Sequence, residues 1–196
     1  MIARSGRSRP SAAPIRYGGR VADLTSTTPW TDADASRDAL EAALAPLGME
    51  YELFPCDPSL ADTAAFCEAY GFSPGDSANT IVVIGKSNPP VFAACVVLAT
   101  HRLDVNRAVR ARLGARKASF ASADETRQLT GMEIGGVTVF GLPPDMPIWI
   151  DADVMTRERI VLGGGSRSWK VIAPPAILQG LPNAVVAEGL ASPREG

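Results

Sequence analysis

The chain has few of the residues that make metal centres or disulfide frameworks. Its 196 residues include one histidine, His101, and three cysteines. Cys56, Cys67 and Cys95 are odd in number and form no CxxC pair, which argues against a disulfide framework and a zinc site. No HExxH-like spacing joins imidazoles to carboxylates. We therefore expect no metal, no cofactor, reduced core thiols and a structural or surface role for His101.

Long apolar runs are also missing. No run approaches the roughly 18 residues that a membrane span needs. Residues 1–20 contain basic residues but lack the apolar region and cleavage pattern of a signal peptide. We expect a cytoplasmic protein that makes no contact with a membrane.

A strong net charge is absent as well. The formal charge is −2, and residues 1–20 carry five arginines and no acid, so the remainder carries −2 − 5 = −7. Such an acidic body argues against a broad nucleic-acid-binding surface, and we expect no binding to DNA. A local basic patch stays open, because residues 101–117 carry six basic residues against one acid, a balance of 6 − 1 = +5.

Three short motifs are incomplete. Gly85-Lys86-Ser87 follows an apolar run as a phosphate loop would, but Thr80 stands where that loop needs its first glycine, and a proline pair stands where its helix should begin. Ser168 replaces both the third glycine of a dinucleotide turn beginning at Gly163 and the closing glycine of a nucleophile elbow around Ser166. None of these three chemistries is favoured.

What is present is an ordinary globular composition, with 46% apolar and 20% charged residues. Residues 1–30 are rich in Ser, Pro, Gly and Arg and lack an apolar period, which predicts a flexible tail. Residues 31–196 then form a single domain, since their number is typical of one core.

Apolar periodicity and cap residues predict an alternation of helices and strands. Helices are expected at 36–47, 57–71, 104–114 and 122–130, the last with a Ser122–Glu125 capping box. Strands are expected at 49–54, 80–84, 91–99, 137–140, 148–150, 160–162, 169–173 and 185–187, with 80–84 and 91–99 at the sheet centre. Regular helical crossovers are lacking, so we predict an α+β fold with a mixed, largely antiparallel, barrel-like sheet flanked by helices.

Two glycine-dense stretches are the strongest remaining signal. They are GMEIGGVTVFG at 131–141 and LGGGSRS at 162–168. Glycine lets a ligand approach main-chain N–H groups closely, so such loops bind oxygens or anions without a charged side chain. We interpret residues 129–142 as the main-chain wall of a ligand pocket, while two tight turns between strands remain the alternative.

The order of short segments resembles the YbaK/EbsC family, the prolyl-tRNA-synthetase-associated editing domain. The resemblance covers roughly residues 55–181, and the ordered spacing of its segments makes it fairly specific. The segments are SANTIVV at 77–83, VVL at 96–98, RLD at 102–104, GARK at 114–117, LTG at 129–131, GGVT at 135–138, FG at 140–141, Asp151 and Gly164-Gly165.

This resemblance implies a mixed α+β fold. It also implies an enzyme that hydrolyses the ester between a wrong amino acid and its tRNA. One or two methylenes are worth only about 1 to 3 kcal/mol in a pocket, so synthetases misload similar small amino acids and a second sieve removes them. Here the sieve would be free-standing. The implied partners are aminoacyl-tRNA and, as a further candidate, an aminoacyl-tRNA synthetase.

Two positions depart from the family pattern. Asn79 stands where the family usually has a lysine, so it can orient a substrate or water but offers no positive charge. Val139 replaces the proline of a GxxxP loop that maps to residues 135–139, which restores an N–H donor. Lys86 and Lys170 are the other cations near these motifs, and we expect both to be solvated.

Under this hypothesis Asn79 is the candidate catalytic position, and Arg107 and Arg110 meet tRNA phosphates, unless they form a solvated helix face. The aminoacyl pocket comes from the first glycine stretch, and the second forms a facing wall near the terminal adenosine. The expected substrate-binding residues are Gly131, Gly135, Gly136, Val137, Thr138, Val139, Gly164, Gly165, Ser166 and Arg167.

Two other functions stay open. The first is a module of the same fold that lost the chemistry and binds aminoacyl-tRNA, a free amino acid or a nucleotide. The second is a hydrolase that acts on another small ester or thioester in the same glycine-lined pocket.

Overall fold

The computed structural model describes residues 16–17, 20–21 and 29–194. Most of the predicted tail, residues 1–30, therefore lies outside the described residues. Within it, β1 (Arg16–Tyr17) pairs antiparallel with β2 (Arg20–Val21), and a 3-10 turn, η1 (Pro29–Thr31), carries the buried Trp30. Trp30 belongs to the main core, one residue ahead of the predicted domain boundary.

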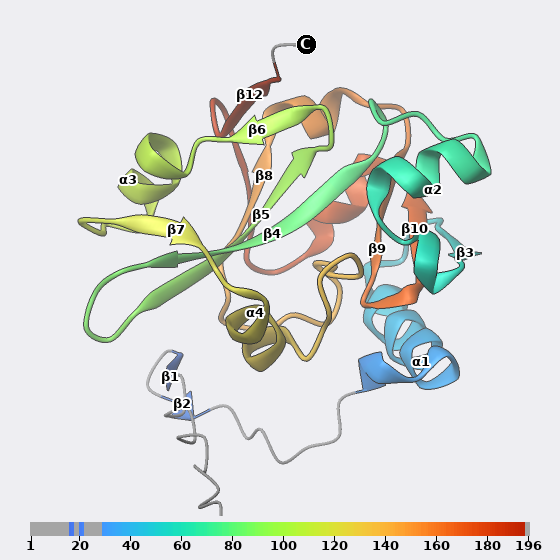
Figure 1. Cartoon of the computed structure of the whole chain (residues 1–196), viewed down its shortest axis with the longest axis horizontal. Helices are drawn as coiled ribbons and strands as arrows, with labels where there is room; N and C mark the ends of the chain where they lie inside the picture. Colours follow the sequence, from blue (N-terminus) through green and yellow to red (C-terminus); the bar gives the residue numbers. More distant parts are fainter. Residues whose placement is uncertain (1–15, 18–19, 22–28, 195–196) are drawn as a thin grey trace, which may run out of the picture.

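A five-stranded sheet forms the centre of the molecule, in the order β11-β8-β5-β4-β7 (Figure 1). β4 and β5 form the predicted central antiparallel hairpin, β7 adds antiparallel to β4, and β8 and β11 run parallel to β5. The bounds of these strands are β4 Ala78–Gly85, β5 Val91–Leu98, β7 Ala118–Phe120, β8 Ile148–Asp151 and β11 Ala184–Ala187.

A second, three-stranded antiparallel sheet has the order β3-β10-β9. A bridge between Ser77 and Val161 connects it to the start of β4. The mixed, largely antiparallel α+β prediction is confirmed, but within the described residues the sheets do not close into a barrel. The remaining strands are β3 Glu52–Pro55, β9 Ile160–Gly164, β10 Ser166–Ala173, and the paired β6 His101–Leu103 and β12 Ala191–Pro193.

Among the described residues, four α-helices and several short helical turns flank the sheets. Figure 1 shows α3 and α4 on either side of the β7 end of the central sheet. The predicted helix at 104–114 is a π-helical turn followed by a short α-helix, capped by Asp104, whose carboxylate accepts from the Arg107 N–H at 3.0 Å. The helices are α1 Ala33–Leu44, α2 Thr63–Tyr70, α3 Arg110–Arg112 and α4 Ala123–Thr130; the turns are η2 Ala45–Leu47, η3 Pro58–Leu60, η4 Val105–Val109, η5 Ala152–Thr156 and η6 Pro175–Gly180.

The central hairpin is buried on both faces because its side chains alternate between two cores. Val82 and Val96 enter the larger core, which contains α1. Val83 and Val97 face the other side, where Val109 of η4 covers them. The η4–α3 segment and the larger core therefore lie on opposite faces of the sheet.

The predicted strand at 137–140 is wrong, since these residues form an irregular loop that pairs with no strand. They are nevertheless buried, with Phe140 fully inaccessible to solvent. A run of β-branched and aromatic residues indicated burial here, and periodicity could not distinguish a buried strand from a buried loop. The short strands β6, β7 and β12 were not predicted, because three residues are too few to show an alternation.

The capping box of α4 is confirmed and gives a first prediction. Ser122 Oγ accepts from the Glu125 N–H at 3.2 Å, and Glu125 accepts from the Ser122 N–H at 2.7 Å. Ser122→Ala should lower the free energy of unfolding by about 1 kcal/mol in urea titrations, because it leaves a helix N–H without its acceptor. Ser122→Asp keeps an acceptor and should retain most of the stability; equal losses in both variants would contradict the cap as the cause.

Candidate functional site

A cavity of about 460 Å³ lies between the edge of β4, the start of α2 and the loop that follows α4. Its volume is typical of small-ligand sites. Phe120 and Ile134, both more than half exposed, stand on its lining. The remaining lining residues are Ala61, Asp62, Thr63, Phe66, Ser77, Ala78, Asn79, Thr80, Ile81, Val82, Ala121, Thr126, Gly135, Val137, Val161, Leu162, Gly163 and Lys170.

One wall of the cavity is the edge of a β-strand. β7 pairs with β4 only at residues 83–85, so it leaves the edge of β4 from 78 to 81 without a partner strand. The Val82 carbonyl on this edge accepts from the Ala121 N–H at 2.9 Å, and alternation turns the main chain of Thr80 toward the same edge. The Thr80 hydroxyl is buried and has no hydrogen-bond partner among the described residues. This wall offers strand-edge main-chain groups to a ligand, and the Thr80 hydroxyl lies buried within it.

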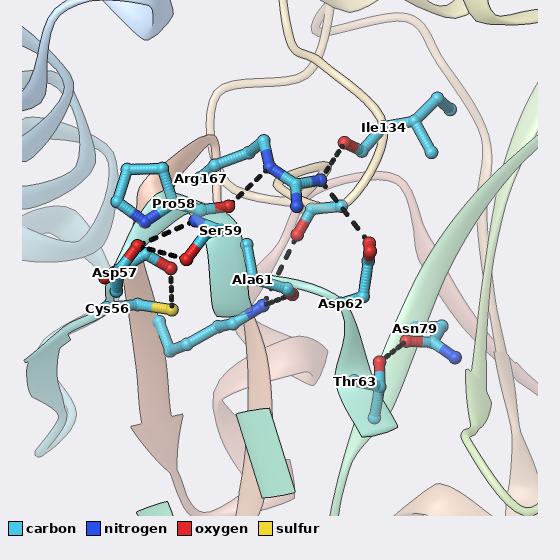
Figure 2. A network of polar contacts seen from close by, with 12 residues as sticks. Cys56, Asp57, Pro58, Ser59, Ala61, Asp62, Thr63, Asn79, Ile134 and Arg167 are labelled. Carbon is cyan, nitrogen blue, oxygen red and sulfur yellow. Dashed lines mark hydrogen bonds and ion pairs between the residues drawn. The ribbon is translucent and has the colours of Figure 1, made fainter. Parts of the chain in front are cut away.

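Asn79 is held by a neighbouring hydroxyl. Thr63, at the first turn of α2, donates from its Oγ1 to Asn79 Oδ1 at 2.9 Å, as Figure 2 shows. Because the amide oxygen accepts this bond, the amide nitrogen is the end left to donate. Asn79 is therefore an oriented donor on the cavity wall.

Lys170 supplies the only cation among the described residues that line the cavity. Its side chain extends from β10 and is only 5% exposed. The ammonium donates to the Ala61 carbonyl at 2.6 Å and to the Gly135 carbonyl at 3.3 Å, and lies 5.3 Å from the centre of the Phe66 ring. The expectation that Lys170 is solvated is wrong, whereas Lys86 is exposed as predicted.

The surroundings of Lys170 lower its pKa below the usual value for lysine. Burial is the largest cause, because it penalises the charged form, and Arg167 acts in the same direction. Asp62 and the two thiols nearby, Cys56 and Cys67, oppose this shift. Keeping Lys170 protonated therefore destabilises the folded protein, because the charge is buried.

Arg167 connects the two sides of the cavity mouth from outside. Its guanidinium donates to the Pro58 carbonyl at 2.8 Å and to the Ile134 carbonyl at 3.1 Å, and it lies 3.4 Å from the Asp62 carboxylate. Figure 2 shows the side chain between Pro58 on one side and Ile134 and Asp62 on the other. Arg167 and Lys170 therefore both join the η3–α2 segment to the loop at 134–135.

The glycine-dense stretches pack against each other. A Cβ at Gly136 would lie 2.5 Å from the Ser166 carbonyl oxygen, and one at Gly163 would collide with the main chain of 136–137. The Gly165 N–H donates to the Gly136 carbonyl at 2.7 Å. Gly165 has a positive φ of 84°, and a Cβ there would collide with Trp30. At Gly136 and Gly165 glycine makes room for other parts of the protein, whereas Gly163 both makes room for the main chain of 136–137 and lines the cavity.

The structure brings three of the predicted site residues, Asn79, Gly135 and Val137, to the lining of one cavity. Ser166 is buried behind it, where its hydroxyl lies 2.9 Å from that of Ser36 in α1. Arg167 acts at the mouth, as described above. The predicted residues that are not among the lining residues are Gly131, Gly136, Thr138, Val139, Gly164, Gly165, Ser166 and Arg167.

Sequence reasoning missed Thr63, Thr80 and Lys170. Thr63 lies on the helix predicted at 57–71, and Thr80 lies on a predicted strand, but no pattern indicated which of their side chains face a cavity. Lys170 is preceded by an irregularity in the pairing of β9 with β10 between Ser166 and Lys170. Such an irregularity changes which face a side chain occupies, and it leaves no mark in the sequence.

The family model of the aminoacyl-tRNA editing domain matches residues 57–181, more than half of the chain. This chain belongs to that family. The match begins at η3 and ends just after η6, so it includes every residue that lines the cavity. It leaves out α1 and β3, which belong to the same folded body.

Solved structures agree with this assignment of the editing domain. A candidate trans-editing enzyme for prolyl-tRNA synthetase has a TM-score of 0.67 and 26% identity, with 82% of this chain and 98% of that chain covered. A hypothetical protein of the same fold has a TM-score of 0.70 and 23% identity, with coverage of 79% and 99%. A candidate signal transduction protein from Marinobacter aquaeolei contains the fold in 30% of its length, with 79% of this chain covered, 17% identity and a TM-score of 0.54.

The predicted phosphate-binding arginines of the editing domain do not line the cavity. Arg107 and Arg110 are exposed on η4 and α3. This segment covers the sheet face opposite the larger core. It leads through β7 to Phe120 on the cavity lining, so a bound molecule that touched both would have to pass around the β7 edge.

Other features of the editing domain are structural. His101 lies 2.9 Å from the Asp153 carboxylate, and the three cysteines are free and buried, with burial raising the pKa of Cys95 to about 12. In the part of the chain that the structure describes, no group of three or more His, Cys, Asp or Glu side chains could hold a metal ion. None of the described helices is long and apolar enough to cross a membrane.

The lowered pKa of Lys170 predicts a pH dependence of stability. Between that lowered pKa and the usual value of 10.5, the unfolded chain still binds the proton that the folded chain has released. Burial of the charged lysine therefore lowers the free energy of unfolding most at pH values below the lowered pKa. This destabilisation disappears as the pH rises toward 10.5. The free energy of unfolding of the wild type should rise relative to Lys170→Met across this range.

Urea unfolding at several pH values from 7 to 10.5 measures this difference. Lys86→Met, which changes an exposed lysine, should differ from the wild type by a nearly constant amount over the same range. A difference between wild type and Lys170→Met that does not change with pH would contradict the lowered pKa.

Proposed function

We propose that this protein hydrolyses the ester bond of an incorrectly aminoacylated tRNA, as a free-standing editing protein in the cytoplasm. The observation that carries the proposal is the cavity that lies wholly within residues matched by the aminoacyl-tRNA editing domain. The family membership supports an aminoacyl-tRNA substrate. The structural relative described as a trans-editing enzyme for prolyl-tRNA synthetase makes that synthetase the first partner to test.

The aminoacyl group would enter between the β4 edge and the 134–135 loop. The amide nitrogen of Asn79, fixed by Thr63, would donate to the substrate. Val137, Leu162 and Phe66 would surround the amino-acid side chain, since these apolar residues line the cavity. A closed apolar wall rejects larger side chains by shape, which is what a second sieve requires.

The chemistry would depend on position more than on a side-chain base. Among the described lining residues, Asp62 is the only carboxylate, and its side chain is 71% exposed and paired with Arg167. No histidine or cysteine belongs to this lining set. Water held against the ester by main-chain and amide donors, with the ribose hydroxyl beside the ester passing the proton, meets this constraint.

The first test is a deacylation panel. Several tRNAs, tRNA-Pro among them, are each charged with a wrong small amino acid, and ester loss is followed with and without the protein. We expect acceleration for one small group of amino acids. Asn79→Leu should slow it about 5- to 10-fold, because a substrate hydrogen bond of about 1 kcal/mol is lost.

Asn88→Leu is the matched control, since Asn88 is an exposed asparagine in the turn between β4 and β5 and does not line the cavity. No acceleration with any charged tRNA, together with retained binding of aminoacyl-tRNA, would reject hydrolysis and leave a binding module of this fold. Acceleration of small esters that equals that of aminoacyl-tRNA would point to a different ester hydrolase.

The second test concerns tRNA binding. If Arg107 and Arg110 neutralise phosphates, Arg107→Ala and Arg110→Ala should each weaken binding and reduce the slope of log affinity against log salt by about 1. Arg37→Ala, which removes an exposed arginine of α1, serves as the control. Unchanged slopes in both variants would assign these arginines to a solvated surface.

A further inference from the structure

Lys170 has a donor that the protein itself does not use. An ammonium carries three N–H groups, and two of them go to the Ala61 and Gly135 carbonyls. Within residues 29–194, no third hydrogen-bond partner and no carboxylate pairs with it, because the nearby Asp62 forms its ion pair with Arg167. The remaining N–H belongs to a side chain on the cavity lining.

A buried charge without a counter-ion is expensive to retain. Two neutral carbonyls compensate the lost hydration of an ammonium only in part, which agrees with its lowered pKa. A purely structural strut between two carbonyls would not need the charge. The arrangement instead calls for a negative group that arrives with the ligand.

Ester hydrolysis generates such a group. When water attacks, the carbonyl oxygen of the ester becomes an oxyanion, and preformed donors that face it stabilise the transition state more than the ground state. Across the cavity lining, Asn79 provides an oriented amide, but this amide carries no charge.

We propose that Lys170, placed on β10 and anchored by the Ala61 and Gly135 carbonyls, is the cationic catalytic residue that binds the ester carbonyl oxygen through its third N–H. This inference rests on the proposed function and names the residue on which its rate depends. It moves the positive charge of the site from β4, where Asn79 stands, to the facing strand of the other sheet.

The step balances without a further reactant. The oxygen of water forms a bond to the carbonyl carbon, and the π electrons of the carbonyl move onto the oxygen beside Lys170. When the double bond re-forms, the bond to the ribose oxygen breaks, and that oxygen takes the proton lost by water. The products are the free amino acid and the uncharged tRNA.

The test exchanges the position of the charge. Lys170→Met should lower the single-turnover deacylation rate about 100-fold or more, as expected for removal of an oxyanion donor. Asn79→Lys alone should give no gain, because it adds a second ammonium to the cavity. The double variant Asn79→Lys, Lys170→Met should recover at least tenfold of the lost rate, since it returns one cation to the cavity from the facing wall.

Rescue by a lysine at position 79 distinguishes a catalytic charge from a structural role of Lys170. A lysine at position 79 supplies the charge but does not restore the hydrogen bonds of Lys170 to the Ala61 and Gly135 carbonyls. Lys170→Gln, which keeps an N–H donor without charge, repeats the loss if the methionine variant does not fold, and near-UV circular dichroism checks the fold of each. Binding of a non-hydrolysable aminoacyl-adenosine amide should change less than the rate. Lys86→Met should leave both unchanged.

Two results would overturn the assignment while leaving the proposed function intact. One is a rate within about threefold of the wild type in Lys170→Met and Lys170→Gln. The other is a loss that the double variant does not recover, which would make Lys170 a support of the cavity wall. Absence of hydrolysis by the wild type on every charged tRNA would instead reject the proposed function, and this inference with it.

Discussion

The main-chain contact between residues 135–136 and 163–165 is the constraint on which the site depends. It joins the loop after α4 to the three-stranded sheet through the hydrogen bond from Gly165 to Gly136, and side chains larger than hydrogen would separate the two. The edge of β4 then lies opposite a closed wall. A cavity exists here because two segments meet on one side and β7 stops short on the other.

Two cations depend on that contact in different ways. Arg167 holds the outside of the mouth through carbonyls and one carboxylate, whereas Lys170 holds the inside through carbonyls alone. Arg167 is paired with Asp62 and partly solvated. It can therefore join the two sides of the cavity mouth with little cost in desolvation of its charge. Lys170 keeps a buried charge that forms no ion pair among the described residues, and such a group in a cavity is a candidate for chemistry.

The sequence predicted the fold better than the site. The central hairpin at 80–84 and 91–99, the capping box at Ser122 and the order of family-like segments are local or ordered signals, and each was confirmed by the structure or by the family match. The surface position expected for Lys170 was wrong, because an irregularity in strand pairing decided its face. The glycine content indicated that other atoms approach the main chain closely here. It could not show whether those atoms belong to a ligand or to another segment of the protein.

Trp30, near the beginning of the domain, packs against glycines that lie far along the chain, behind the cavity wall. Its ring lies against Gly165 and Gly141. The adjacent α1 contacts β10 through the hydroxyl of Ser36 and through the Ala33 carbonyl, which accepts from Trp169 at 2.8 Å. Trp30, Ala33 and Ser36 precede the segment shared with the editing family. They pack behind the contact between the two glycine stretches and support it from the side away from the cavity. Relatives with a different segment at this point could tune the shape of the cavity from behind while every residue that meets the substrate stays the same.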